Sequence, residues 1–96
     1  MEGIILQNPK IIKMKKENVL LKPEQRELDK TISYVKNYTY KPYKFLSGGF
    51  VESKVLAINS KRIIIEVKWG VQNDIRNETY TKQVTINRAN MKPLNY

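Results

Sequence analysis

Residues 62–69 read Arg-Ile-Ile-Ile-Glu-Val-Lys-Trp, and the alternation within this stretch predicts a β-strand. One face of the strand is apolar and comprises Ile63, Ile65, Val67 and Trp69. The opposite face carries Arg62, Glu66 and Lys68. This pattern is typical of a strand that buries one face and exposes the other.

Two further strands flank this one. Residues 50–58 precede it across Asn59-Ser60-Lys61, a polar turn of the kind that hairpins use. Residues 78–86 follow it after a polar loop over residues 70–77, and they place Tyr80, Val84 and Ile86 on one face. Three short strands at regular spacing predict a meander that closes into a small barrel or a curved sheet.

The chain before these strands predicts an extension that carries one helix, over residues 23–36. Pro23 suits a helix start, and Leu28, Ile32 and Val35 fall on one apolar stripe. Residues 37–49 are predicted to be an extended linker, because Pro42 disfavours helix at the residue before it. Residues 1–22 form a basic extension for which short strands and a helix from Pro9 are both open.

Residues 49–94 resemble the small five-stranded SH3-like barrels of the Tudor and KOW kind. The resemblance covers four segments: a strand that opens after a glycine (49–58), its hairpin partner ending in an aromatic residue (61–69), a third strand (80–86), and the closing segment 84–94, which ends Met-Lys-Pro-Leu. It implies a mainly β (α+β) chain of one domain, with an antiparallel SH3-like or Tudor-like barrel over residues 50–96. Members of this fold bind RNA, DNA, ribosomal proteins or methylated tails, so the fold alone selects no function.

The Tudor resemblance also implies a possible ligand site. Tudor domains hold methyl-ammonium groups in an aromatic cage by cation–π attraction. Here Trp69 and Tyr80 are the candidates for the cage, with Asp74 or Glu78 as its acidic residue. The alternative is that both rings are core aromatics, because each lies on the apolar face of its strand.

Composition excludes several classes of chemistry. The chain has 96 residues, a formal net charge of +9, no cysteine and no histidine, which removes disulfides, thiol nucleophiles, imidazole bases and the usual zinc ligands. No phosphate-binding loop or calcium-loop spacing is present, so we expect no enzyme, cofactor, metal or small-molecule substrate. The N-terminus lacks the apolar run of a signal peptide or membrane span, which favours a cytoplasmic protein.

The most suggestive segment for binding runs from residue 30 to residue 51, which contains no acidic residue. Lysines neutralise phosphates and exposed aromatic rings stack on unpaired bases, so this composition favours a nucleic-acid or ribonucleoprotein partner. The alternative is that the tyrosines pack across the barrel mouth and the lysines are simply solvated. The predicted contact residues are Lys36, Tyr38, Tyr40, Lys41, Tyr43 and Lys44, with Arg62, Lys68 and Arg88 extending the footprint.

Two other functions fit the same sequence. One is a protein-interaction module, such as a small phage or plasmid protein that acts on a host target through loops or a strand edge. The other is a structural subunit of a larger assembly. Salt separates them, because nucleic-acid binding weakens steeply as salt rises and an apolar protein interface barely responds.

Overall fold

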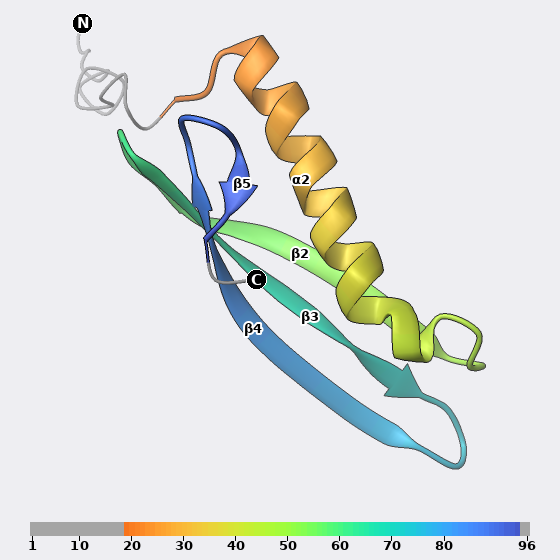
Figure 1. Cartoon of the computed structure of the whole chain (residues 1–96). Coiled ribbons are helices and arrows are strands. Elements are labelled where there is room, and N and C mark those ends of the chain that lie inside the picture. Colours follow the sequence, from red (N-terminus) through yellow and green to blue (C-terminus); the bar gives the residue numbers. More distant parts are fainter. Residues whose placement is uncertain (1–18, 95–96) are drawn as a thin grey trace, which may run out of the picture.

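The computed structural model describes residues 19–94, which form one helix packed on one antiparallel sheet (Figure 1). Helix α2 (Lys22–Tyr40) leads into a short 3-10 helix, η2 (Lys41–Tyr43). Four strands follow, β2 (Gly49–Ile58), β3 (Arg62–Gln72), β4 (Asn77–Asn87) and β5 (Lys92–Pro93), in the sheet order β2-β3-β4-β5. The predicted mainly β (α+β) class and its three principal strands are confirmed. No ladder joins the outer strands β2 and β5 within residues 19–94, so the closed barrel stays a prediction.

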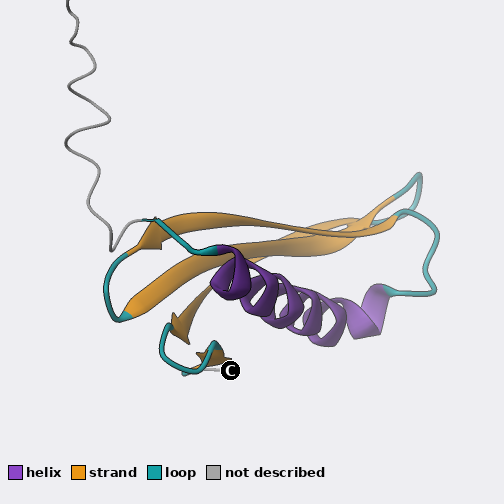
Figure 2. Cartoon of the chain, turned by 90° about the horizontal axis from the view of Figure 1, so that it is seen from above, coloured by secondary structure: helices purple, strands orange, loops and turns teal. Residues whose placement is uncertain are grey.

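The predicted alternation decides which face of the sheet is covered. The face that packs against α2, called the inner face, carries the fully buried Ile63, Ile65 and Val67 of β3 and Val84 and Ile86 of β4. The helix contributes Leu28 and Val35, both fully buried, from its predicted apolar stripe. Figure 2 shows α2 on this face of the sheet and, among the described residues, no helix on the opposite, outer face.

The helix is longer than predicted, and the prediction of an extended linker over residues 37–49 is wrong. α2 continues to Tyr40, η2 follows at once, and only residues 44–48 lie between η2 and β2. Pro42 is compatible with this path because it stands in the first turn of η2, where a helix needs no N–H donor. The β-prone residues Tyr38 and Tyr40 therefore belong to a helix, and tertiary packing overrides their local preference.

Strands β3 and β4 extend further than predicted because Gly70 is part of the sheet. The sequence places residues 70–77 in a loop, yet β3 runs to Gln72, and Gly70 pairs with Thr79 across the ladder. The actual turn comprises residues 73–76, where the Asn73 side chain accepts hydrogen bonds from the N–H groups of Ile75 and Arg76 at 2.8 and 2.7 Å. Asn59 closes the β2–β3 turn in the same way, with Lys61 and Arg62 as donors.

The segment after β4 returns to the helix. Residues 88–91 form a turn, after which β5 pairs with Ile86 and Asn87, in line with the closing strand that the sequence predicts. The Thr31 hydroxyl donates a hydrogen bond of 2.5 Å to the backbone carbonyl of Met91, which ties this turn to the middle of α2. Residues 1–18 lie outside the described residues, and so does the predicted basic extension apart from its last four residues. Within residues 19–94 no helix combines the length and apolarity needed to cross a bilayer.

Candidate binding surface

The two predicted cage residues lie side by side on the inner face. Trp69 and Tyr80 are directly opposite one another in the β3–β4 ladder, and their ring centroids are 5.7 Å apart. Tyr43 of η2 joins them, with its ring 6.2 Å from that of Tyr80. Trp69 packs against the core, whereas Tyr80 is about two-fifths exposed. These three rings, the aromatic cluster, thus lie at the margin of the core and not within it.

The acidic residue of the aromatic cluster is Glu78, but its carboxylate is already engaged. One oxygen accepts hydrogen bonds from the hydroxyls of Tyr43 and Tyr80 at 3.2 and 3.0 Å. The other oxygen pairs with the Arg76 guanidinium at 2.8 Å, and that guanidinium lies 5.8 Å from the centre of the Tyr43 ring. Arg76 therefore supplies a cation of this chain beside the aromatic cluster. Asp74, the other acidic candidate, lies in the turn 73–76.

These contacts change the acidity of two groups in opposite directions. Hydrogen bonds from Arg76 and from Tyr80 lower the pKa of Glu78. The Tyr43 hydroxyl and the Glu78 carboxylate beside it raise the pKa of Tyr80 to about 12. At neutral pH the lowered pKa of Glu78 keeps its carboxylate ionised, and the Tyr80 phenol is neutral and donates a hydrogen bond to it.

A spectrophotometric titration tests this arrangement. We expect one of the six tyrosines to ionise near pH 12, about two units above an ordinary tyrosine. Because the folded-state pKa is the higher one, this contribution to stability is complete below about pH 10 and is lost as the pH rises toward the folded value. The late step should disappear in Tyr80→Phe and move to lower pH in Glu78→Gln. A late step that persists unchanged in Tyr80→Phe would contradict the assignment.

The three tyrosines predicted to stack on bases have different surroundings. Tyr38 and Tyr40 are two residues apart on α2 and so point about 200° apart around the helix axis. Tyr40 packs at the start of β2, where its hydroxyl oxygen lies 3.1 Å from the Cβ position that a side chain at Gly49 would occupy. Tyr43 belongs to the aromatic cluster. Only Tyr38 is largely exposed, at 63%, and its ring lies 6.2 Å from that of Tyr34, which is 57% exposed.

Tyr34 borders a hollow that the sequence alone did not indicate. The helix–β5 groove, a hollow of about 410 Å³ between α2 and the chain end, is lined by Lys30, Thr31, Tyr34, Met91, Lys92 and Pro93. Lys30 forms an exposed ion pair with Glu27, at 3.1 Å, and Lys92 is exposed. An exposed aromatic ring and two lysines thus line the same open hollow. The signal in the sequence is limited to Tyr34 and Lys30, one turn apart, because the position of Lys92 depends on the fold.

The other predicted lysines lie near the C-terminal end of α2 and just after it. Lys36 is half-buried, and Lys41 is exposed in η2. Lys44 has its ammonium nitrogen 5.8 Å from the centre of the Phe45 ring, and Phe45 is 91% exposed. Phe45 was not among the predicted contact residues, although it lies within the basic and aromatic segment that the sequence singled out.

Arg62 and Lys68 do not share a surface with the tyrosines. They lie on the outer face of the sheet, where Glu52 stands opposite Lys68 in the ladder and Lys54 lies 3.7 Å from Glu66. Charges of both signs therefore alternate on this face, and Lys54 and Lys68 have acidic neighbours. The predicted footprint is divided between two faces, and the outer face does not continue the aromatic one.

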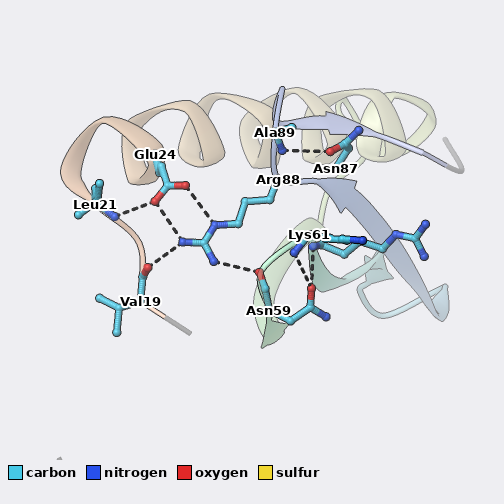
Figure 3. Close-up of polar contacts among 9 residues, drawn as sticks. Val19, Leu21, Glu24, Asn59, Lys61, Asn87, Arg88 and Ala89 are labelled. Carbon is cyan, nitrogen blue, oxygen red and sulfur yellow. Dashed lines mark hydrogen bonds and ion pairs between the residues drawn. The ribbon is translucent and has the colours of Figure 1, made fainter. Parts of the chain in front are cut away.

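Arg88 is a structural residue in this fold, contrary to its predicted place in a nucleic-acid footprint (Figure 3). Its guanidinium donates to both carboxylate oxygens of Glu24 at 3.1 and 3.2 Å, to the Val19 carbonyl at 2.8 Å and to the Asn59 carbonyl at 2.9 Å. Its side chain is only 11% exposed. Hydrogen bonds from Arg88 and from the Leu21 N–H lower the pKa of Glu24. The guanidinium thus joins the start of α2, the β2–β3 turn and the end of β4.

Residues 19–94 contain no group of three or more acidic, histidine or cysteine side chains placed to hold a metal ion. The basic and aromatic features that the structure brings together are the aromatic cluster, the helix–β5 groove and the exposed Lys44–Phe45 pair. Comparison of the chain with protein-family models, with curated proteins and with solved structures finds no match.

Proposed function

We propose that this chain is a non-catalytic protein that binds single-stranded nucleic acid, and that the helix–β5 groove is its principal contact. The observation that carries the proposal is that the exposed Tyr34 ring, Lys30 and Lys92 line one hollow of about 410 Å³. A base can stack on the tyrosine while the two ammonium groups contact the phosphates on either side of it. Stacking on an aromatic ring tolerates any base, so we expect little sequence preference.

Tyr38 supports this proposal as the second ring of the same surface. It follows Tyr34 by one helical turn, and the two rings are 6.2 Å apart. Both remain more than half exposed in a helix whose apolar stripe is elsewhere, so neither ring is needed to complete the core. The net charge of +9 adds attraction for any polyanion and speeds the encounter.

The SH3-like relationship is part of the same proposal. A meander of three strands followed by a turn and a short fourth strand agrees with that pattern, and these folds commonly bind nucleic acids or proteins. Closure of a barrel would require a further contact between the two outer strands of the sheet. The helix–β5 groove does not require closure, because its lining comes from α2, the turn 88–91 and β5.

A fluorescence-anisotropy titration with single- and double-stranded oligonucleotides of DNA and RNA tests the function. We expect binding to single strands that weakens steeply between low and physiological salt, because phosphate contacts release counterions. The double variant Tyr34→Ala/Tyr38→Ala should bind about tenfold more weakly or worse, since each stacked base contributes about 1–3 kcal/mol. Thermal unfolding should change little, because both rings are largely exposed.

The lysines allow a control that is matched in charge. Lys30→Gln/Lys92→Gln removes two positive charges from the groove, and Arg62→Gln/Lys68→Gln removes two from the outer face. The first pair should reduce affinity and flatten the salt dependence more than the second. Equal losses in the two variants would show that only net charge matters, and absence of binding at low salt would rule out the function.

A protein-interaction module is the second candidate, and the far end of the molecule favours it. Phe45 and Ile75 are 91% and 92% exposed, and they come from the loop before β2 and from the β3–β4 turn. These two loops are joined by a hydrogen bond of 2.8 Å from the Asn73 amide to the Ser47 carbonyl, and they lie at the same end of the sheet in Figure 1. Binding through this pair would resist salt and would be lost in Phe45→Ser/Ile75→Ser.

A further inference from the structure

Strand β2 has one edge whose backbone is not paired with another described strand. The alternation of hydrogen bonds along the β2–β3 ladder shows which residues of β2 direct their backbone N–H and C=O groups toward that edge. Gln72 donates its N–H to the Gly48 carbonyl at 2.9 Å, which makes these two residues a hydrogen-bonded pair. Hydrogen bonding alternates along an antiparallel ladder, so Glu52 and Lys54 bond to β3 while Ser53 directs its N–H and C=O away from it. Gly49 fits the same alternation, because its N–H points away from β3 and donates to the Leu46 carbonyl of the preceding loop.

The second half of this edge is apolar and accessible. The register shifts between Val55 and Ala57, a β-bulge that places Leu56 outside the regular ladder. Val55 and Leu56 are 43% and 41% exposed, and the run from Val55 to Ile58 lines an open hollow of about 420 Å³. No strand lies beyond β2 among the residues that the structure describes. A long edge with exposed apolar side chains is a template for pairing with another strand.

We propose that β2 pairs with β2 of a second copy of this chain, antiparallel and centred on Ser53, to make a symmetric dimer. The sequence around Ser53 is complementary to itself in this register. Glu52 of each copy lies opposite Lys54 of the other, and Val51 of each copy lies opposite Val55 of the other. Ser53 meets its own counterpart, and their outward N–H and C=O groups exchange two hydrogen bonds.

The charges of the outer face agree with this pairing. Within one chain, Glu52 is opposite Lys68 and Lys54 is opposite Glu66, so the signs alternate from strand to strand. A second copy in the proposed register continues that alternation across the junction without placing like charges side by side. Because the symmetry axis is perpendicular to the sheet, the two helices lie on the same face of the extended sheet. The dimer would therefore present two helix–β5 grooves toward one partner.

Sedimentation velocity of the full chain, freed of nucleic acid and measured over a range of concentrations, tests the dimer. We expect a reversible equilibrium between monomer and dimer. Glu52→Lys converts two attractive pairs of the junction into two repulsive ones and should weaken dimerisation by about tenfold or more. Lys54→Glu should do the same, and the double variant Glu52→Lys/Lys54→Glu should restore the dimer.

The double variant separates the junction from effects inside one chain. Each single change places a like charge opposite Lys68 or Glu66, and the double variant contains both of these internal conflicts. Rescue in the double variant can therefore come only from pairing between copies. Lys68→Glu is the matched control, because it sets a like charge opposite Glu52 without touching the edge, and it should leave the dimer in place.

Two outcomes would overturn the proposal. A chain that stays monomeric at every concentration would mean that the edge is solvated or covered by another part of the same chain. A dimer that the single charge reversals leave unchanged, or that the double variant fails to restore, would be formed by another surface. Neither outcome bears on nucleic-acid binding, which the groove variants test separately.

Discussion

Replacing Gly70 with alanine should destabilise the protein by about 3 kcal/mol or more, because the fold leaves no space for a side chain there. A Cβ atom at this position would lie 1.9 Å from the carbonyl oxygen of Glu78 and 2.8 Å from its carbonyl carbon. Both are backbone atoms of the neighbouring strand and cannot swing away. The φ angle of Gly70 is +155°, a conformation that residues with a side chain rarely adopt.

Thermal and urea unfolding measure this effect. A loss of about 3 kcal/mol corresponds to a fall of roughly 10–25 °C in the melting temperature of a domain of this size. Thr79→Ala is the control, because Thr79 is exposed and directly opposite Gly70, so truncating it perturbs the same ladder without crowding it. If Gly70→Ala costs no more than the control, the strands separate locally with little strain and the steric argument fails.

Replacing Arg88 with methionine should cost about 2 kcal/mol or more, because methionine keeps much of the length but none of the donors. The Val19 and Asn59 carbonyls and the Glu24 carboxylate would all lose a hydrogen-bond donor, because all three accept from the Arg88 guanidinium. The start of α2 would also lose its link to the sheet. Denaturant unfolding of Arg88→Met beside Arg62→Met, an exposed arginine next to the same turn, measures the difference. Equal losses would mean that Arg88 contributes no more than a surface charge.

The pH dependence of the same pair gives a second readout. Arg88 lowers the pKa of Glu24 in the folded state, so its contribution to stability is present above the unfolded pKa of a glutamate, about 4.3, and is lost as the pH falls. The stability difference between the natural chain and Arg88→Met should therefore narrow as the pH is lowered through this range. A difference that stays constant down to acidic pH would place the effect in packing and not in the ion pair.

The strands could be predicted because each depends on a local pattern. In β3, alternation alone separates the buried Ile63, Ile65 and Val67 from the outer charges, and the structure confirms it. The prediction fails where a residue type that usually indicates one local conformation adopts another in the folded chain. The sequence around Gly70 predicts a loop, yet Gly70 lies in β3 and lets β3 and β4 approach closely. Pro42 predicts extended chain before it, yet it stands in the first turn of a 3-10 helix.

The binding residues were harder to predict because a list of residue types does not say which face they share. Lys36, Tyr38 and Tyr40 are close in sequence, but they point in different directions around the axis of α2. Arg88 counts as one more positive charge in the sequence, and nothing near it indicates that Glu24, far away in the chain, will pair with it. Lys92 becomes a candidate contact residue only because the fold brings β5 beside α2.

The one-sided cover of the sheet has a consequence for how this sequence can vary. The outward positions of β3 do not contact α2, so substitutions there can alter the charge pattern while the core stays the same. The insertion or deletion of a single residue within β3 is a different matter, because it would exchange the two faces of the strand beyond that point. Isoleucines and valines would then turn to solvent, and charged side chains would turn toward the helix. We therefore expect variants of this chain to tolerate many outward substitutions but to keep the length of β3 constant.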